Sequence, residues 1–151
     1  MNELTQKSAG ELAHLIKRKE VSSKEVVEAH LDRIKEVNPE INAITVTLEE
    51  SALEMADKAD SSNTDIEDKP FHGVPITIKE NIDFVGTTTT NGLPLLAEYM
   101  PPRNAPLVDR MLNYGEIPIG RTNMPEMGRR IDKENTQRGR NMNHETEGKT
   151  T

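Results

Sequence analysis

The stretch "FHGVPITIKENIDFVGTTTTNG", residues 71–92, contains an alternating apolar run that ends in a lysine. Val74, Ile76 and Ile78 recur at every second position, which is typical of a strand with one buried face. Lys79 then stands at the end of that strand. Lysine is usually kept in water, so its place here needs an explanation.

Two explanations for Lys79 remain open from the residues alone. A lysine at a strand end commonly reaches solvent, and this reading involves no chemistry. Alternatively, partial desolvation lowers its pKa, so that the neutral amine accepts a proton. Thr77, Asn81 and the loop "GTTTTNG" at 86–92 offer hydrogen-bonding neighbours. A general base also needs a nucleophile, which these residues do not identify.

The residues after this loop predict a helix and a second strand. Residues 105–114 place four apolar side chains on one helical face, and "EIPIG" at 116–120 is typical of a buried strand. Strand, loop, helix and strand form a β-α-β unit, so we expect an α/β fold with a β-α-β core over residues 71–126.

Residues 8–60 are expected to form helices. Two capping boxes, Ser8 with Glu11 and Ser22 with Glu25, predict where the first two helices begin. We expect the second helix to stop at Asn38-Pro39, a short strand at 41–47, and a third helix from 48 to 59.

Composition limits the partners and the size of the core. The 151 residues are enough for one domain, and the net charge of −7 argues against nucleic acid or an anionic membrane as a partner. There is no cysteine and no apolar run of membrane-spanning length, so we expect a soluble, cytoplasmic protein. Apolar residues are sparse in 127–151, which we expect to be a disordered or non-native tail after residues 1–126.

No cofactor or metal site is expected. "GEIPIGRT" at 115–122 has the spacing of a phosphate-binding loop, but a stiff apolar strand and a proline replace the flexible amides that cradle phosphate. The histidines show no metal-ligand spacing; they are His14, His30, His72 and His144.

Several ordered motifs carry a resemblance to a known family. "HGVPITIKENID", "GTTTTNG" and "NAPLVDRMLNYGEIPIGRTNMPEMG" closely resemble the amidase signature family of C–N hydrolases, over roughly residues 5–143. The resemblance implies the N-terminal portion of an α/β/α sandwich with a mixed central sheet. It also implies a Ser–cis-Ser–Lys triad that acts on a small amide substrate.

By motif position, Lys79 resembles the triad lysine, which acts as the base at the start of the relay. Asn123 in "GRTNMPE" and Thr87 and Thr88 in the loop beside the lysine resemble supporting residues. Arg121 stands where the family commonly has a lysine.

The sequence departs from the family at the nucleophile. Both family serines lie in a Gly/Ser-rich segment shortly after a stretch like "RGRNMN", whereas the last serine here is Ser62. We therefore expect a truncated amidase that is inactive alone. The alternative is a non-catalytic binding or assembly module that pairs with a longer, complementary amidase chain. A small enzyme using Lys79 with Glu80 or Asp83 is a third possibility, and it lacks a nucleophile.

Overall fold

The computed structural model describes residues 2–62, 68–129 and 134–143, and it divides into two compact units. Unit 1 contains the chain up to Glu36, Leu48–Thr77 and Asp109–Ile119. Unit 2 contains Val37–Thr47, Ile78–Val108 and the chain from Gly120 onward.

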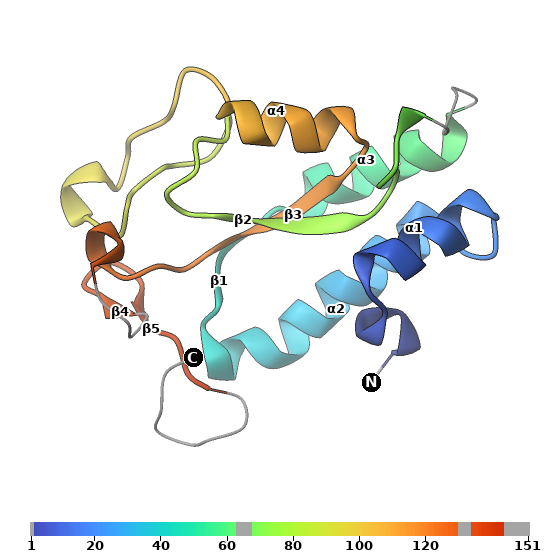
Figure 1. The fold of residues 1–151 in the computed structure, drawn as a ribbon. Helices are drawn as coiled ribbons and strands as arrows, with labels where there is room; N and C mark the ends of the chain where they lie inside the picture. Colours follow the sequence, from blue (N-terminus) through green and yellow to red (C-terminus); the bar gives the residue numbers. More distant parts are fainter. Residues whose placement is uncertain (1, 63–67, 130–133, 144–151) are drawn as a thin grey trace. The chain divides into compact units, whose positions relative to one another are not determined.

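Helices and strands follow one another along the chain as shown in Figure 1. The α-helices are α1 (Ala9–Lys17), α2 (Ser23–Ile41), α3 (Glu49–Ser61) and α4 (Pro106–Asn113). The strands are β1 (Ile44–Thr47), β2 (Pro75–Lys79), β3 (Ile117–Thr122), β4 (Glu134–Asn135) and β5 (Gly139–Arg140). Short 3₁₀ turns lie at η1 (Glu3–Gln6), η3 (Pro94–Leu96) and η4 (Glu126–Gly128).

Three strands form a mixed sheet in the order β1-β3-β2. β1 is antiparallel to β3, with Ile44 opposite Thr122. β2 and β3 are parallel, because the N–H of Ile117 donates to the carbonyl of Val74 at one end and the N–H of Glu80 donates to that of Thr122 at the other. Helix α4 connects these two parallel strands, so the predicted β-α-β unit and α/β fold class are confirmed.

Both predicted capping boxes are present. The Ser8 hydroxyl accepts from the N–H of Glu11 at 3.3 Å, and the Glu11 carboxylate accepts from the N–H of Ser8 at 2.7 Å. Ser22 and Glu25 make the same exchange at 3.1 and 2.8 Å before α2. Each box satisfies N–H groups that the first turn of a helix leaves unpaired.

The predicted stop of the second helix at Asn38-Pro39 is wrong, because α2 continues to Ile41 with Pro39 inside it. The N–H of Asn42 donates to the carbonyl of Asn38 at 2.8 Å, which completes a helical turn across the proline. The Asn38 side chain also pairs with the backbone of Ile44 at 2.7 and 2.9 Å. Proline lacks a donor and its ring crowds the preceding turn, and these bonds help to hold the last turn of the helix in spite of that cost.

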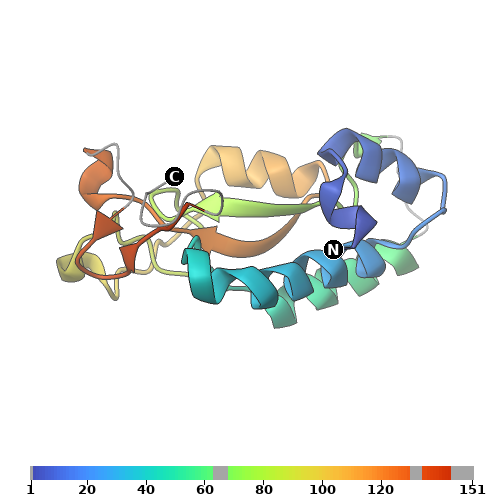
Figure 2. The same cartoon turned by 90° about the horizontal axis from the view of Figure 1, so that it is seen from below.

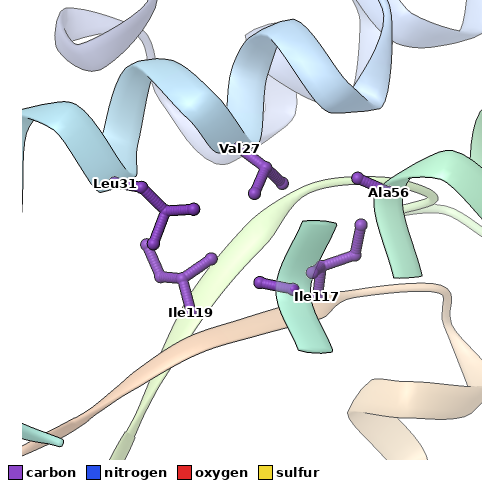
Figure 3. Close-up of a cluster of buried hydrophobic side chains, with 6 residues drawn as sticks. Val27, Leu31, Ala56, Ile117 and Ile119 are labelled. Atoms are coloured by element: carbon purple, nitrogen blue, oxygen red, sulfur yellow. The ribbon is translucent and has the colours of Figure 1, made fainter. Parts of the chain in front are cut away.

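Unit 1 has an apolar core. Side chains from α2, α3 and β3 converge in one cluster, shown in part in Figure 3, which consists of Val27, Leu31, Ala52, Ala56, Ile117 and Ile119. A second cluster joins Leu12 and Ile16 of α1 to Val26 and Val74. Figure 2 shows α2 and α3 on one face of the parallel strands and α4 on the other face. The small side chains of Ala52 and Ala56, both 0% exposed, let α3 approach β3 closely.

The interior of unit 2 is largely polar. Its buried apolar side chains among the described residues are Ile78, Val108 and Met124, together with Pro101 and Pro125. Its buried polar side chains are Glu80, Thr87, Thr89, Thr90, Arg121, Asn123, Asn135 and Asn141. Buried polar groups require hydrogen-bond partners, so a network must hold this unit together.

Part of the segment expected to be a tail has a described conformation. β4 and β5 form a small antiparallel hairpin with Glu134 opposite Arg140. Residues 130–133 and 144–151 of that segment lie outside the described residues. In the parts of the chain that the structure describes, no helix has the length and apolar character needed to cross a membrane.

Candidate functional site

Lys79 is the last residue of β2 and is half-buried. Its backbone carbonyl accepts two hydrogen bonds, from the N–H of Ile82 at 2.9 Å and from Nη2 of Arg121 at 3.3 Å. The strand therefore ends in a tight turn that is stabilised by the hydrogen bonds from Ile82 and Arg121. The Lys79 side chain starts from that turn.

Arg121 lies in β3 and is fully buried. Its Nη2 also donates to the carbonyls of Glu80 at 3.2 Å and Ile82 at 2.8 Å, while Nη1 donates to the hydroxyl of Thr87 at 2.7 Å. Burial lowers the pKa of Arg121, and the neighbouring carboxylates of Glu80 and Asp83 oppose that change. One guanidinium thus binds both the turn after Lys79 and the threonine-rich loop, which is the segment "GTTTTNG" at residues 86–92.

Glu80 is a second buried charge, with only 1% of its surface exposed. Its Oε1 accepts from the hydroxyl of Thr90 at 2.6 Å and from Nε of Arg138 at 3.4 Å. Its Oε2 is buried without a hydrogen-bond partner among the described residues. The pair with Arg138 connects the turn after β2 to the β4–β5 hairpin.

The threonine-rich loop folds back on itself. The N–H and the hydroxyl of Thr87 both donate to the carbonyl of Phe84, at 3.2 and 2.9 Å. The hydroxyl of Thr90 accepts from the N–H of Gly92 at 3.2 Å. Thr88 lies between these buried residues and is half-buried. The hydroxyls of Thr87 and Thr90 therefore serve as partners for charged side chains and backbone.

Asn123 follows β3 and is fully buried. Its Nδ2 donates to Oδ1 of Asn141 at 2.7 Å and to the carbonyl of Gly139 at 3.2 Å. Its Oδ1 accepts from Nδ2 of Asn135 at 2.7 Å and from the N–H of Met124 at 3.0 Å. Both ends of the amide are engaged, so Asn123 anchors the hairpin.

The structure brings the predicted residues together through two arginines, Arg121 and Arg138, to which the sequence assigned no role in the site. Arg121 binds both Lys79 and Thr87, whereas Asn123 belongs to the neighbouring asparagine network. Arg138 joins the two groups, because its N–H donates to Oδ1 of Asn135 at 2.6 Å and its Nε to Glu80. The signal for Arg121 was present in the sequence as a charged residue at the end of an apolar strand.

A separate pocket of about 290 Å³ lies in unit 1 and contains none of these residues. His72 and Glu116 are among its lining residues. Nε2 of His72 lies 3.1 Å from the carbonyl of Ala59, and burial raises the pKa of Glu116.

Comparison with known proteins gives a consistent result. A family model described as Amidase matches residues 25–147. The chain is 40% identical over 134 residues to a glutamyl-tRNA(Gln) amidotransferase chain of Caldanaerobacter subterraneus subsp. tengcongensis, which covers 89% of this chain and 28% of that protein. It is 42% identical over 137 residues to the indoleacetamide hydrolase of Bradyrhizobium diazoefficiens, which covers 90% of this chain and 26% of that protein. The chain thus spans about a quarter of the length of the curated relatives it matches.

Solved structures agree with the fold. A fatty acid amide hydrolase matches 93% of this chain and 25% of its own length, with a TM-score of 0.87 and 25% identity. Another match has a TM-score of 0.88 and 29% identity, covering 95% of this chain and 32% of that chain. That structure is described as a vestigial protein complex that reveals the evolutionary origins of an s-triazine catabolic enzyme.

Proposed function

The chain belongs to the amidase family, and from that premise we propose that its 151 residues supply the lysine-bearing part of a site that hydrolyses carbon–nitrogen bonds in small amides. The proposed base is Lys79. Its neutral amine takes a proton from a serine that follows a cis peptide bond, and that serine activates a second serine to attack the amide carbonyl.

One observation carries the proposal: the turn that presents Lys79 is bound at the carbonyls of residues 79, 80 and 82 by a buried guanidinium. A proton acceptor is effective only if it is held in reach of its partner, and a rigid strand end with a fixed turn provides that. Thr87 supports this arrangement as a ligand of Arg121, Thr88 as its neighbour in the loop, and Asn123 by anchoring the hairpin.

The serines of the relay are the missing component. No serine follows Ser62 in the sequence, so we infer that the 151 residues alone do not hydrolyse amides. The nucleophile then comes from residues outside this sequence. A cytoplasmic location is part of the same proposal.

Complementation tests this proposal. The chain is mixed with the part of the Bradyrhizobium indoleacetamide hydrolase that it does not cover, and turnover of indoleacetamide is measured. We expect no turnover from either piece alone and measurable turnover from the mixture. Lys79→Met should reduce that turnover by roughly 10²-fold or more, because a positioned general base contributes on that order.

The matched control is Lys58→Met, which removes an exposed lysine of unit 1 and should leave the turnover unchanged. Hydrolysis by the unmixed chain would contradict the proposal, and so would a mixture that is indifferent to Lys79→Met.

A second candidate is a non-catalytic assembly module that pairs with a longer amidase chain. Exposed apolar side chains in unit 2 favour it: Val85, Leu95, Tyr99 and Met100 are 49%, 93%, 46% and 51% exposed. Surface of this kind is enriched at protein–protein interfaces. This candidate predicts a stable complex with an intact amidase, seen by size-exclusion chromatography, that survives Lys79→Met and is weakened by Leu95→Asp.

A further inference from the structure

We propose that Arg121 is a positioning residue for Lys79, a role that rests on the proposed function of Lys79 as a base. The guanidinium binds the carbonyls of Lys79, Glu80 and Ile82, and it therefore restrains the backbone from which the lysine side chain starts. Arg121 acts through that backbone and takes no part in the proton transfer.

The acceptors around Arg121 suit a guanidinium. Nη2 lies 3.3, 3.2 and 2.8 Å from the carbonyl oxygens of Lys79, Glu80 and Ile82, and Nη1 lies 2.7 Å from the hydroxyl of Thr87. These acceptors approach from the turn and from the loop, and the planar fork of arginine presents donors to both at once. A lysine ammonium concentrates its three donors on a single atom, so it serves the two sides less completely than the guanidinium fork does.

The choice of partners distinguishes this arginine from an ordinary ion pair. Arg121 is 0% exposed, and a buried charge must recover the hydration that it loses. Its hydrogen bonds in the described structure go to three backbone carbonyls and one hydroxyl. A charge placed only for stability is more simply paired with a carboxylate. Here the cation fixes the conformation of residues 79–82.

The loop shares the same anchor. Thr87 accepts from Nη1 while it donates to the carbonyl of Phe84, so the loop and the turn after β2 are held by one side chain. Removing the guanidinium should make both the turn after β2 and the loop at residues 86–92 more mobile, while unit 1 stays folded.

Nuclear magnetic resonance on the whole 151-residue chain tests the inference without any need for turnover. The two readouts are the splitting of the side-chain methylene protons of Lys79 and the exchange rate of the Ile82 amide. In Arg121→Met we expect the Lys79 methylene protons to become degenerate and Ile82 exchange to rise roughly tenfold or more, because charged hydrogen bonds in a local opening unit are lost. The Ile117 amide, which donates to Val74 in unit 1, is the internal control.

Arg121→Lys is the conservative variant. It should restore only part of the protection at Ile82, because it returns the charge without the fork. If the Ile117 amide also loses protection in Arg121→Met, the result from Arg121→Lys is used instead. Loss of the Lys79 methylene splitting and of Ile82 protection in Arg121→Lys, with Ile117 still protected, supports the inference. Wild-type values for Lys79 and Ile82 in Arg121→Lys overturn it. Unchanged Lys79 signals in Arg121→Met overturn it, as do Lys79 protons already degenerate in the wild type.

These outcomes are separate from those for the proposed function. An ordered Lys79 that depends on Arg121, in a complemented mixture without turnover, supports this inference and contradicts only the proposed function. An active mixture in which Lys79 is ordered without Arg121 contradicts only this inference.

Discussion

Arg121 and Glu80 are buried charges whose hydrogen bonds go to carbonyls, hydroxyls and one partly exposed arginine. Burying an ion costs several kcal/mol even after relaxation, and hydrogen bonds to charged groups return about 1.5–3 kcal/mol each. Both residues are therefore tolerable only where several partners converge. This requirement explains why the turn after β2, the threonine-rich loop and the hairpin meet around them.

Gly115 tests how closely unit 1 is packed at a single residue. Its φ is +86°, and an added Cβ would lie 2.8 Å from Cα of His72. Gly115→Ala should therefore lower the free energy of unfolding by roughly 2 kcal/mol or more, through left-handed strain and the backbone clash. Urea denaturation measures the change.

Gly10→Ala is the matched control for that substitution. A Cβ added to Gly10, in α1, would have no atom within 4 Å, so alanine should raise stability by up to about 1 kcal/mol through helix propensity. Equal effects of the two substitutions would contradict the steric argument.

Glu116 gives a prediction about pH. Burial raises its pKa in the folded state, so the ionised carboxylate is disfavoured there. The folded state therefore binds a proton at Glu116 more readily than the unfolded state does. Ionised Glu116 lowers the free energy of unfolding at pH values above the folded-state pKa, and this destabilisation disappears as the pH falls below the unfolded-state pKa. Glu116→Gln should therefore raise the Tm at about pH 7 and give little gain near pH 4, around the ordinary carboxyl pKa. A gain of the same size at both values would contradict this assignment.

At the scale of elements, capping boxes and apolar periodicity place α1, α2 and α3, and packing then decides which faces are buried. α2 presents Val27 and Leu31 to β3, and α3 presents two alanines to the same cluster. In α4 the predicted apolar face is only partly buried, since Val108 is 1% exposed and Leu107 is 53% exposed.

Leu31→Ala measures what the α2 contact contributes. Leu31 is 2% exposed, so its truncation should cost about 2–5 kcal/mol through lost transfer free energy and the cavity that remains. The control is Leu107→Ala, which should change stability by less than about 0.5 kcal/mol. Thermal and urea unfolding of both variants measure the difference. An equal loss of unfolding free energy in Leu107→Ala and Leu31→Ala would contradict the role assigned to the α2 contact.

At the scale of the whole molecule, the two units are held by different forces. Unit 1 buries clusters of Leu, Ile, Val and Ala, whereas unit 2 relies on hydrogen bonds among buried polar side chains. Apolar burial contributes about 25 cal/mol per Å², while a typical hydrogen bond nets only about 1 kcal/mol. We therefore expect unit 1 to be the more stable of the two.

Native-state hydrogen exchange measures this difference. We expect the amides of α2 and α3 in unit 1 to exchange with opening free energies well above those of Glu80 and Asn123 in unit 2. Guanidinium chloride at low concentration should narrow the gap, because the opening that exposes more surface has the larger denaturant dependence. A single exchange free energy shared by both units would show that the chain unfolds as one cooperative body.

Much of the fold could be predicted from local pattern. The alternation in residues 74–78, the helical face after Ala105 and the capping serines each act over a few residues, so the sequence reveals them directly. The prediction for the end of α2 is wrong because the N–H of Asn42 donates to the carbonyl of Asn38 and completes the turn around Pro39. The usual tendency of proline to end a helix takes no account of such a bond.

Some residues of the candidate site could likewise be predicted from the sequence, whereas others were identified only in the folded structure. Lys79 stands out by its place after an apolar strand, and Asn123, Thr87 and Thr88 were named through family resemblance. The roles of these four residues stay predictions. Arg138 and Asn135 gave no such signal, because the bonds that join them to Glu80 and Asn123 span 58 and 12 residues of the chain.

Local sequence patterns predict the β-α-β order, the helix starts and the place of Lys79 at a strand end, because these features depend on periodicity and on neighbours within one turn. The tertiary structure alone decided that Arg121 is fully buried and that its one guanidinium binds both the turn after Lys79 and the loop at Thr87. The physical reason is desolvation: a charge can be buried only where distant backbone and side-chain acceptors converge on it, and that convergence exists only in the folded chain.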